Sequence, residues 1–174
     1  MRNLLDRILK KDRNTFSEYL DMRKKTIESR SSDYNRLDTL KSGSFYAMLC
    51  DYNFTSVEEG ERFTSLACFA DGTVNLFHSK GGGVFGAGQE SEPVKNACIA
   101  LLRNTEQTLK LFKRTEDFFL PELESARVYA VTDNGIYMIE YNIYLAWVHD
   151  ENLLRIRILS DELISAIRRH NRGK

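Results

Sequence analysis

The sequence predicts an α+β domain with a mainly antiparallel sheet of five or six strands, a long central helix, a C-terminal helix and a helical N-terminal extension. Asp71-Gly72 and Asp133-Asn134-Gly135 each separate two apolar runs, which is typical of β-hairpins. Residues 92–113 carry apolar side chains at three- and four-residue steps, which is typical of a helix packed on a sheet. The composition, 42% hydrophobic and 29% charged with zero net charge, suits a globular chain.

Residues 1–43 are predicted to form a helical extension and linker, and residues 44–174 a single domain. Thr15-Phe16-Ser17-Glu18 has the form of a capping box, so we expect either one bent helix or two short ones. Such an amphipathic arm can dock on the domain or on a partner. The apolar residues with the spacing of a helix face are Leu4, Leu5, Ile8, Leu9, Phe16, Tyr19, Leu20 and Ile27.

The domain is predicted to begin with a strand at 45–50, followed by a loop at 57–62. Residues 63–70 and 73–79 are expected to pair as the first hairpin. Asp71-Gly72 between them favours a type I′ turn, in which both central residues have positive φ.

The central helix is predicted to start at Pro93 with Ser91 or Glu92 as its cap, because proline is favoured in the first helical turn. Residues 127–132 and 136–141 are expected to form the second hairpin.

The C-terminal region is harder to assign from its pattern. Residues 143–149 fit a short helix or a strand equally well. The apolar residues at 154, 156 and 158 alternate with arginines, which predicts one more strand. Ser160 is then expected to cap a final helix that ends in basic residues.

Five of the ten glycines lie in one stretch between a predicted strand and the central helix. They match the letters of a dinucleotide-binding motif, but Gly86 lies several residues before the helix starts, and Glu90 and Glu92 put negative charge where a phosphate would lie. The stretch is therefore interpreted as a glycine-rich connection or a bulged edge segment that packs closely on a neighbour or offers backbone to a partner. Its candidate site residues are Ser79, Lys80, Gly81, Gly82, Gly83, Gly86 and Gly88, with His78 as a polar neighbour.

No catalytic set of residues is evident, and no metal site or cofactor is predicted. The histidines, His78, His149 and His170, lack metal-binding spacing. His78 precedes Ser79 and could act as a general base, but a strand histidine held by a hydrogen bond is the favoured interpretation. The cysteines at 50, 68 and 98 lie in apolar elements without a C-x-x-C motif, which predicts buried reduced thiols.

Charge is distributed unevenly along the chain. Residues 1–41 and 155–174 each carry +4, and residues 42–154 carry −8. Acidic residues are interspersed in both basic segments, which disfavours nucleic acid as a partner. The acidic segment 42–154 suits a basic protein as a partner. No apolar run approaches the roughly 20 residues of a membrane span and the charged N-terminus lacks a signal peptide, so we expect a cytoplasmic protein.

Two resemblances follow from these residues. The order of elements from Phe45 onward resembles the roadblock, longin and profilin-like group of α/β/α scaffolds, which implies a role in protein assembly. The stretch from Leu76 to Gly88, with the Pro93 helix and the second hairpin, resembles small uncharacterised bacterial proteins. Their pattern is Ser-x-Gly-Gly-Gly-x-(Ile or Val)-Gly-(Gly or Ala)-Gly before a helix. This chain departs from it at Phe85, and Ala87 is a near match. For some of those proteins the resemblance implies a setting among toxin and immunity genes, and it supplies no catalytic residue.

The sequence thus predicts a non-enzymatic domain that binds another protein, with an immunity-like or assembly role as its most specific form. Self-association is left open. The alternative is a small-ligand or nucleotide binder that uses the backbone N–H groups of Gly81 to Gly88, with Lys80 as counter-charge. An enzyme that uses His78 with Ser79 is the third hypothesis.

Overall fold

The computed structural model, which describes residues 2–34, 40, 45–56, 60–145 and 150–173, contains one seven-stranded antiparallel sheet. Its strand order is β4-β3-β2-β1-β6-β7-β5. The count exceeds the prediction because the sheet ends in two strands of two residues each, β4 and β5. The strands are β1 (Phe45–Ser56), β2 (Gly60–Phe69), β3 (Val74–His78), β4 (Gly83–Val84), β5 (Lys113–Arg114), β6 (Ser125–Thr132) and β7 (Gly135–Asn142).

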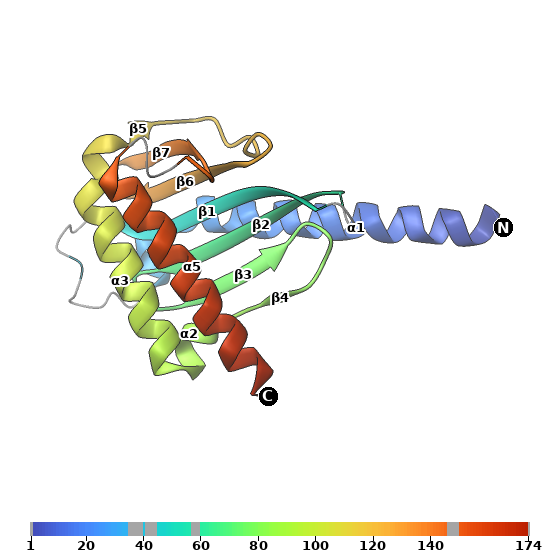
Figure 1. Cartoon of the computed structure of the whole chain (residues 1–174), viewed down its shortest axis with the longest axis horizontal. Coiled ribbons are helices and arrows are strands. Elements are labelled where there is room, and N and C mark those ends of the chain that lie inside the picture. Colours follow the sequence, from blue (N-terminus) through green and yellow to red (C-terminus); the bar gives the residue numbers. More distant parts are fainter. Residues whose placement is uncertain (1, 35–39, 41–44, 57–59, 146–149, 174) are drawn as a thin grey trace.

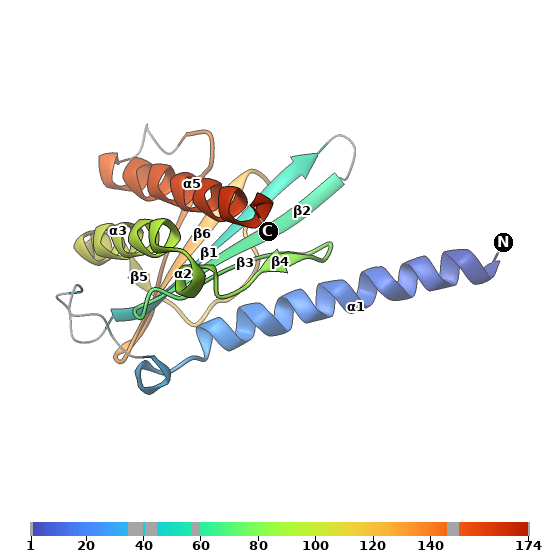
Figure 2. The same cartoon turned by 90° about the horizontal axis from the view of Figure 1, so that it is seen from below.

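Helices cover both faces of the sheet, which confirms the predicted α+β class. On one face α3 (Glu92–Thr108) and α5 (Glu151–Arg172) lie side by side, and on the other lies α1 (Arg2–Ile27) (Figures 1 and 2). A four-residue helix, α2 (Ala87–Glu90), precedes α3. Short 3-10 helices occur at Ser31–Asp33 and Leu109–Leu111.

The strand register decides which side chains meet which helix. Cys50 of β1 lies opposite Leu66 of β2 and Val128 of β6, and this set of positions faces α3 and α5. Met48 is on the same side, since the Thr105 hydroxyl of α3 contacts its sulfur at 3.2 Å. The alternate positions, among them Asp51, therefore face α1.

Both predicted hairpins are confirmed, but the predicted type I′ turn at Asp71-Gly72 is wrong. Gly72 N–H donates to the Phe69 carbonyl at 2.8 Å, and Phe69 N–H donates to Thr73 at 3.0 Å. Gly72 has a φ of 85°, but Asp71 keeps an ordinary negative φ. The connection is thus a type I turn followed by a left-handed glycine, and the Asp71 carboxylate supports it by accepting from Thr73 N–H at 2.8 Å.

The N-terminal segment is a single uninterrupted helix. Thr15 lies inside α1, so the predicted capping box is not a helix start. Leu20 lies half-exposed on the apolar stripe, whereas Tyr19 and Ile27 belong to the hydrophobic core. Farther along the chain, β2 already begins at Gly60, so residues 60–62 are strand rather than loop, and residues 57–59 lie outside the described residues.

The central helix starts as predicted after Ser91, with Pro93 in its first turn, but it ends at Thr108 rather than near 113. The predicted strand around Leu154 to Ile158 is wrong, because α5 runs through it. Asp150 caps α5 by accepting from Asn152 N–H at 2.7 Å. Ser160, expected as the cap, is fully buried in the middle of the helix.

The reason for the error at 154–158 is visible in the burial pattern. The buried face of α5 repeats at steps of three and four residues, through Leu153, Ile156, Ser160, Leu163 and Ile167. Over the five residues 154–158, the spacing of apolar side chains in this helix cannot be distinguished from the alternation expected of a strand. Of the ambiguous stretch 143–149, residues 143–145 form a turn and residues 146–149 lie outside the described residues.

Candidate functional site

The glycine-rich stretch connects β3 to β4 and then leads into α2. Gly81 and Gly82 have φ values of 91° and 80°, which explains glycine at both positions. Ser79 is buried, and its backbone and side chain both bind β2: its N–H donates to the Phe63 carbonyl at 3.0 Å, and its hydroxyl oxygen accepts from Phe63 N–H at 3.0 Å. Ser79 therefore holds the hairpin against the sheet.

The later glycines allow close packing. A Cβ atom on Gly88 would lie 1.8 Å from the Gly72 carbonyl oxygen, and one on Gly83 would lie 2.7 Å from that of Leu76. Gly86 precedes α2 with a φ of 67°. These contacts account for glycine at 83, 86 and 88 through backbone conformation and packing alone.

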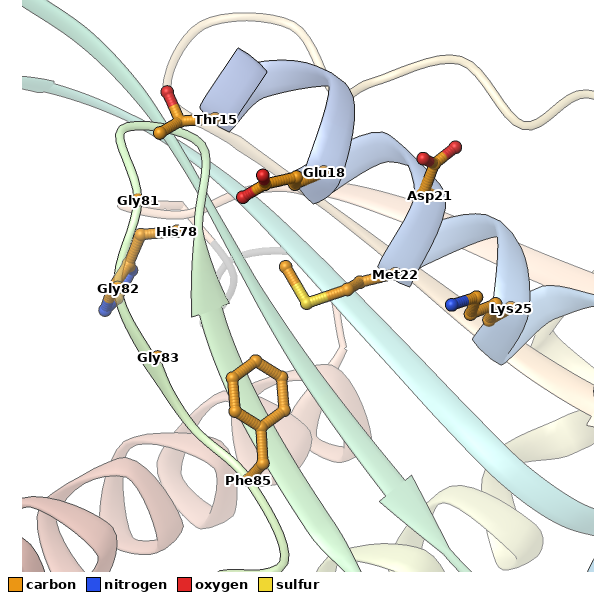
Figure 3. A pocket seen from close by; sticks show the side chains of 10 residues that line it. All are labelled: Thr15, Glu18, Asp21, Met22, Lys25, His78, Gly81, Gly82, Gly83 and Phe85. Atoms are coloured by element: carbon orange, nitrogen blue, oxygen red, sulfur yellow. The ribbon is translucent and has the colours of Figure 1, made fainter. Parts of the chain in front are cut away.

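The hairpin also forms one wall of a groove of about 390 Å³, and α1 forms the other (Figure 3). The glycine loop thus lies beside an element more than 50 positions away in the sequence, which no local pattern indicates. The groove is lined by Thr15, Glu18, Asp21, Met22 and Lys25 of α1, and by His78, Gly81, Gly82, Gly83 and Phe85 of the hairpin.

The groove combines carboxylates with apolar surface. Glu18 and Asp21 are exposed, and neither forms an ion pair with another described residue. In Figure 3 the Glu18 carboxylate points toward the glycine hairpin, and the Met22 side chain extends into the same gap. Phe85 is 54% exposed and stacks on Phe77 with ring centroids 6.4 Å apart. With Lys25, the charged side chains of α1 in the lining are two carboxylates and one ammonium group, so this wall is acidic on balance. An acidic wall opposite an aromatic ring suits a cationic group on an apolar stem.

The groove is poorly suited to a phosphate, because of its hydrogen bonding and its charge. Gly81 N–H already donates to the His78 carbonyl at 3.0 Å, and Gly86 N–H donates to the Asn75 side chain at 3.0 Å. The nearby carboxylates of Glu18 and Asp21 would repel an anion. Lys80 is exposed at the tip of the hairpin and does not line the groove.

His78 and Ser79 engage different partners. His78 lies opposite Thr64 in the register, and its Nδ1 is 2.9 Å from the Thr64 hydroxyl. Thr64 alternates with Leu66 and Cys68 toward the face covered by α5, so the imidazole lies on that side of the sheet. This is the strand histidine held by a hydrogen bond that the sequence favoured, and Ser79 bonds to Phe63 instead.

The other candidate groups lie apart from the groove. His170 Nε2 is 3.3 Å from a Glu90 carboxylate oxygen, which links α5 to α2, and His149 lies outside the described residues. The cysteines are buried and unpaired, as predicted, and burial raises the pKa of the Cys50 thiol. Among the described residues, no group of three His, Cys, Asp or Glu side chains could hold a metal ion.

Sequence reasoning missed the polar network that holds α1 on the sheet. Arg23 of α1 is buried, and its Nε donates to the fully buried Asp51 carboxylate of β1 at 2.5 Å. Its Nη1 donates to the Phe118 carbonyl at 2.5 Å, and its Nη2 to that of Phe119 at 3.1 Å. Burial opposes the charge of Arg23, but the charge and hydrogen bond of Asp51, together with Tyr129 and Tyr19, hold the pKa of Arg23 above its usual value.

Further hydroxyl groups complete the network around Asp51. The Ser65 hydroxyl donates to the second Asp51 oxygen at 2.5 Å and lies 2.9 Å from the Tyr19 hydroxyl. Tyr129 OH donates to the Phe119 carbonyl at 3.0 Å. The side chains of this network are buried, so it positions α1, and with it the acidic wall of the groove. A signal existed: Arg23 interrupts the apolar spacing between Tyr19 and Ile27.

The fold and groove define an α+β domain with an acidic, partly apolar surface cleft. Comparison with protein-family models, curated proteins and solved structures finds no match to the chain. Within the described part of the chain, no helix combines the length and apolar character that crossing a bilayer requires.

Proposed function

We propose that this chain is a non-enzymatic protein-binding domain that takes a basic segment of a partner in the groove between α1 and the glycine hairpin. The observation that carries the proposal is the pairing of Glu18 and Asp21 with the exposed Phe85 ring across one groove. A lysine or arginine of the partner would pack its stem on Met22 and Phe85 and place its charge at the carboxylates.

The sheet edge adds a second mode of recognition. β4 is the outermost strand at this end of the sheet, and Gly83 of β4 lines the groove. An extended peptide beside β4 could pair with its outer backbone groups while its side chains reach the groove. Because glycines form this wall, a partner can approach the backbone closely.

The biological role proposed for this binding is neutralisation of a toxin or assembly of a complex, in keeping with the sequence resemblances. The alternative, a nucleotide or phosphate on Gly81 to Gly88, has less support, since two of the loop N–H groups are already used and carboxylates face the loop.

The chemistry of the groove is tested first with peptides. Two fluorescent peptides of equal length are compared by anisotropy, one with alternating lysine and leucine and one with glutamate in place of lysine. The basic peptide is expected to bind and the acidic one not to bind. Glu18→Gln/Asp21→Asn should weaken binding about tenfold or more, because two charge-assisted contacts of about 1 kcal/mol each are lost.

A matched control separates the groove from overall charge. Glu151→Gln/Glu162→Gln removes two exposed carboxylates on α5 and should leave the affinity unchanged. Equal weakening in both double variants would show that net charge, not the groove, binds the peptide, and would overturn the proposal.

The native partner is then sought with a photo-crosslinking residue at Phe85, with Glu162 as the control position. Crosslinking at Phe85 that is abolished by Glu18→Gln/Asp21→Asn would place the partner in the groove. A partner captured at Glu162 but not at Phe85 would refute the groove as the binding site.

A further inference from the structure

A second cavity, of about 580 Å³, lies on the opposite face of the sheet, between α5 and the strands β1 to β3. The N-terminal helix is on the other side of the sheet (Figure 2), so this cavity lies on a different face from the groove described above, although His78 lines both. Its size falls within the range of about 300–1,000 Å³ that is common for small-molecule sites.

Positive charge enters this cavity from two elements. Arg62 projects from β2 and Arg168 from α5, and both line it. Among the described lining residues Asp161 carries a carboxylate, and Arg157 already pairs with it, since the Arg157 Nε donates to it at 2.7 Å. The two guanidinium groups thus bring positive charge to the cavity from the strand side and from the helix side.

Neutral hydrogen-bonding groups surround the two arginines. The hydroxyls of Thr64 and Ser165 line the cavity, and the His78 ring is held there by its 2.9 Å contact with Thr64. An arginine fork binds the oxygens of a phosphate or of a carboxylate, and the hydroxyl donors beside it can bind the further oxygens that only a phosphate has.

The rest of the lining is apolar. Phe54 of β1 and Ile164 of α5 form part of the wall. A bare inorganic anion would leave this surface uncovered, whereas a ring attached to a phosphate would cover it.

We propose that this cavity binds a small phosphate monoester, with the phosphate between Arg62 and Arg168 and an attached ring against Phe54 and Ile164. No covalent step is involved. The carboxylates of the protein-binding groove, Glu18 and Asp21, lie on α1, across the sheet, whereas His78 lines both cavities.

The test is an NMR titration of the full chain at constant ionic strength, with inorganic phosphate, phenyl phosphate and phenol as probes. Phenyl phosphate is expected to bind about tenfold tighter than inorganic phosphate, because the ring buries apolar surface. Phenol, which lacks the charge, should not bind measurably. The amide signals of Thr64, His78 and Ser165 should shift.

Arg168→Gln should weaken phenyl phosphate binding about tenfold, and Arg169→Gln, its exposed neighbour in α5, should leave it unchanged. Arg168 is exposed, so this variant tests the site without disturbing the core. Arg62→Gln, on β2, is the second test and should also weaken phenyl phosphate binding. The proposal is overturned if phenyl phosphate causes no shifts at about 10 mM, or if Arg168→Gln and Arg169→Gln weaken it equally.

Discussion

At the residue scale, Arg23 decides where the N-terminal helix lies. Its guanidinium reaches through the apolar layer between α1 and the sheet, to Asp51 and to two carbonyl groups of the 118–119 segment. A buried ion pair adds little net stability compared with apolar packing, but removing one member leaves the other charged and unpaired. The pair therefore acts mainly by specifying one docking position for α1.

Arg23→Met is expected to lower the free energy of unfolding by about 3–5 kcal/mol, because Asp51 would remain buried without its countercharge. Urea denaturation followed by circular dichroism measures this. The matched control is Lys24→Met, which alters the adjacent exposed residue and should change stability by less than about 0.5 kcal/mol.

The double variant Arg23→Met/Asp51→Leu sharpens the test. It should be more stable than Arg23→Met alone, because no buried charge is left unpaired. A single variant within about 1 kcal/mol of the wild type would contradict the role given to Arg23.

At the element scale, α2 is held on the turn of the first hairpin. Gly88 of α2 lies against the Gly72 carbonyl, and the Gln89 side chain donates to the Thr73 hydroxyl at 2.9 Å. Two glycine-containing segments, each a local turn signal, thus pack on each other. The contact fixes the path from the glycine hairpin into α3, and so the position of the hairpin wall of the groove.

Gly88→Ala tests this contact, because helix propensity and packing predict changes of opposite sign in the free energy of unfolding. In an isolated helix the change would stabilise by about 1 kcal/mol. Here the added carbon would lie 1.8 Å from a backbone oxygen, so a loss of about 1–3 kcal/mol is expected in thermal or urea unfolding. Gly173→Ala, where the nearest atom to the added carbon would be the His170 carbonyl oxygen at an ordinary 3.6 Å, should be neutral. Stabilisation by Gly88→Ala would show that α2 does not pack on the turn.

At the scale of the whole molecule, the two ends of α1 have different surroundings. Its C-terminal half supplies Tyr19 and Ile27 to the core, whereas its N-terminal part extends past the sheet (Figures 1 and 2). The predicted division at residue 43 stays a prediction, and the position of the core residues makes it testable by truncation.

Deletion of residues 2–14 is expected to change the melting temperature by less than about 3 °C and to leave the groove, lined from Thr15 onward, able to bind the basic peptide. Deletion of residues 2–28 should lower it by more than about 10 °C, because Asp51 loses Arg23 and the sheet face loses its cover. Equal melting temperatures for both truncations would show that α1 is dispensable to the domain.

The sequence alone determined the elements that local rules control. Asp71-Gly72 and Asp133-Asn134-Gly135 predicted both hairpins because turn residues restrict the chain within a few positions. Pro93 predicted the start of α3 for the same reason. The secondary structure of residues 154–158 could not be assigned from local patterns, because five residues do not separate helical from strand periodicity. Burial of one face of α5 along its whole length decided for the helix.

Only the tertiary structure decided what surrounds the glycine loop. The sequence predicted a backbone-rich loop, but the acidic wall that favours a cation comes from Glu18 and Asp21, brought there by the Arg23–Asp51 contact across 28 positions. In the same way, Arg62 and Arg168 share a cavity only because α5 crosses the strands that carry Arg62 and His78. Local propensity acts over a few residues, whereas a site is assembled by packing between distant ones.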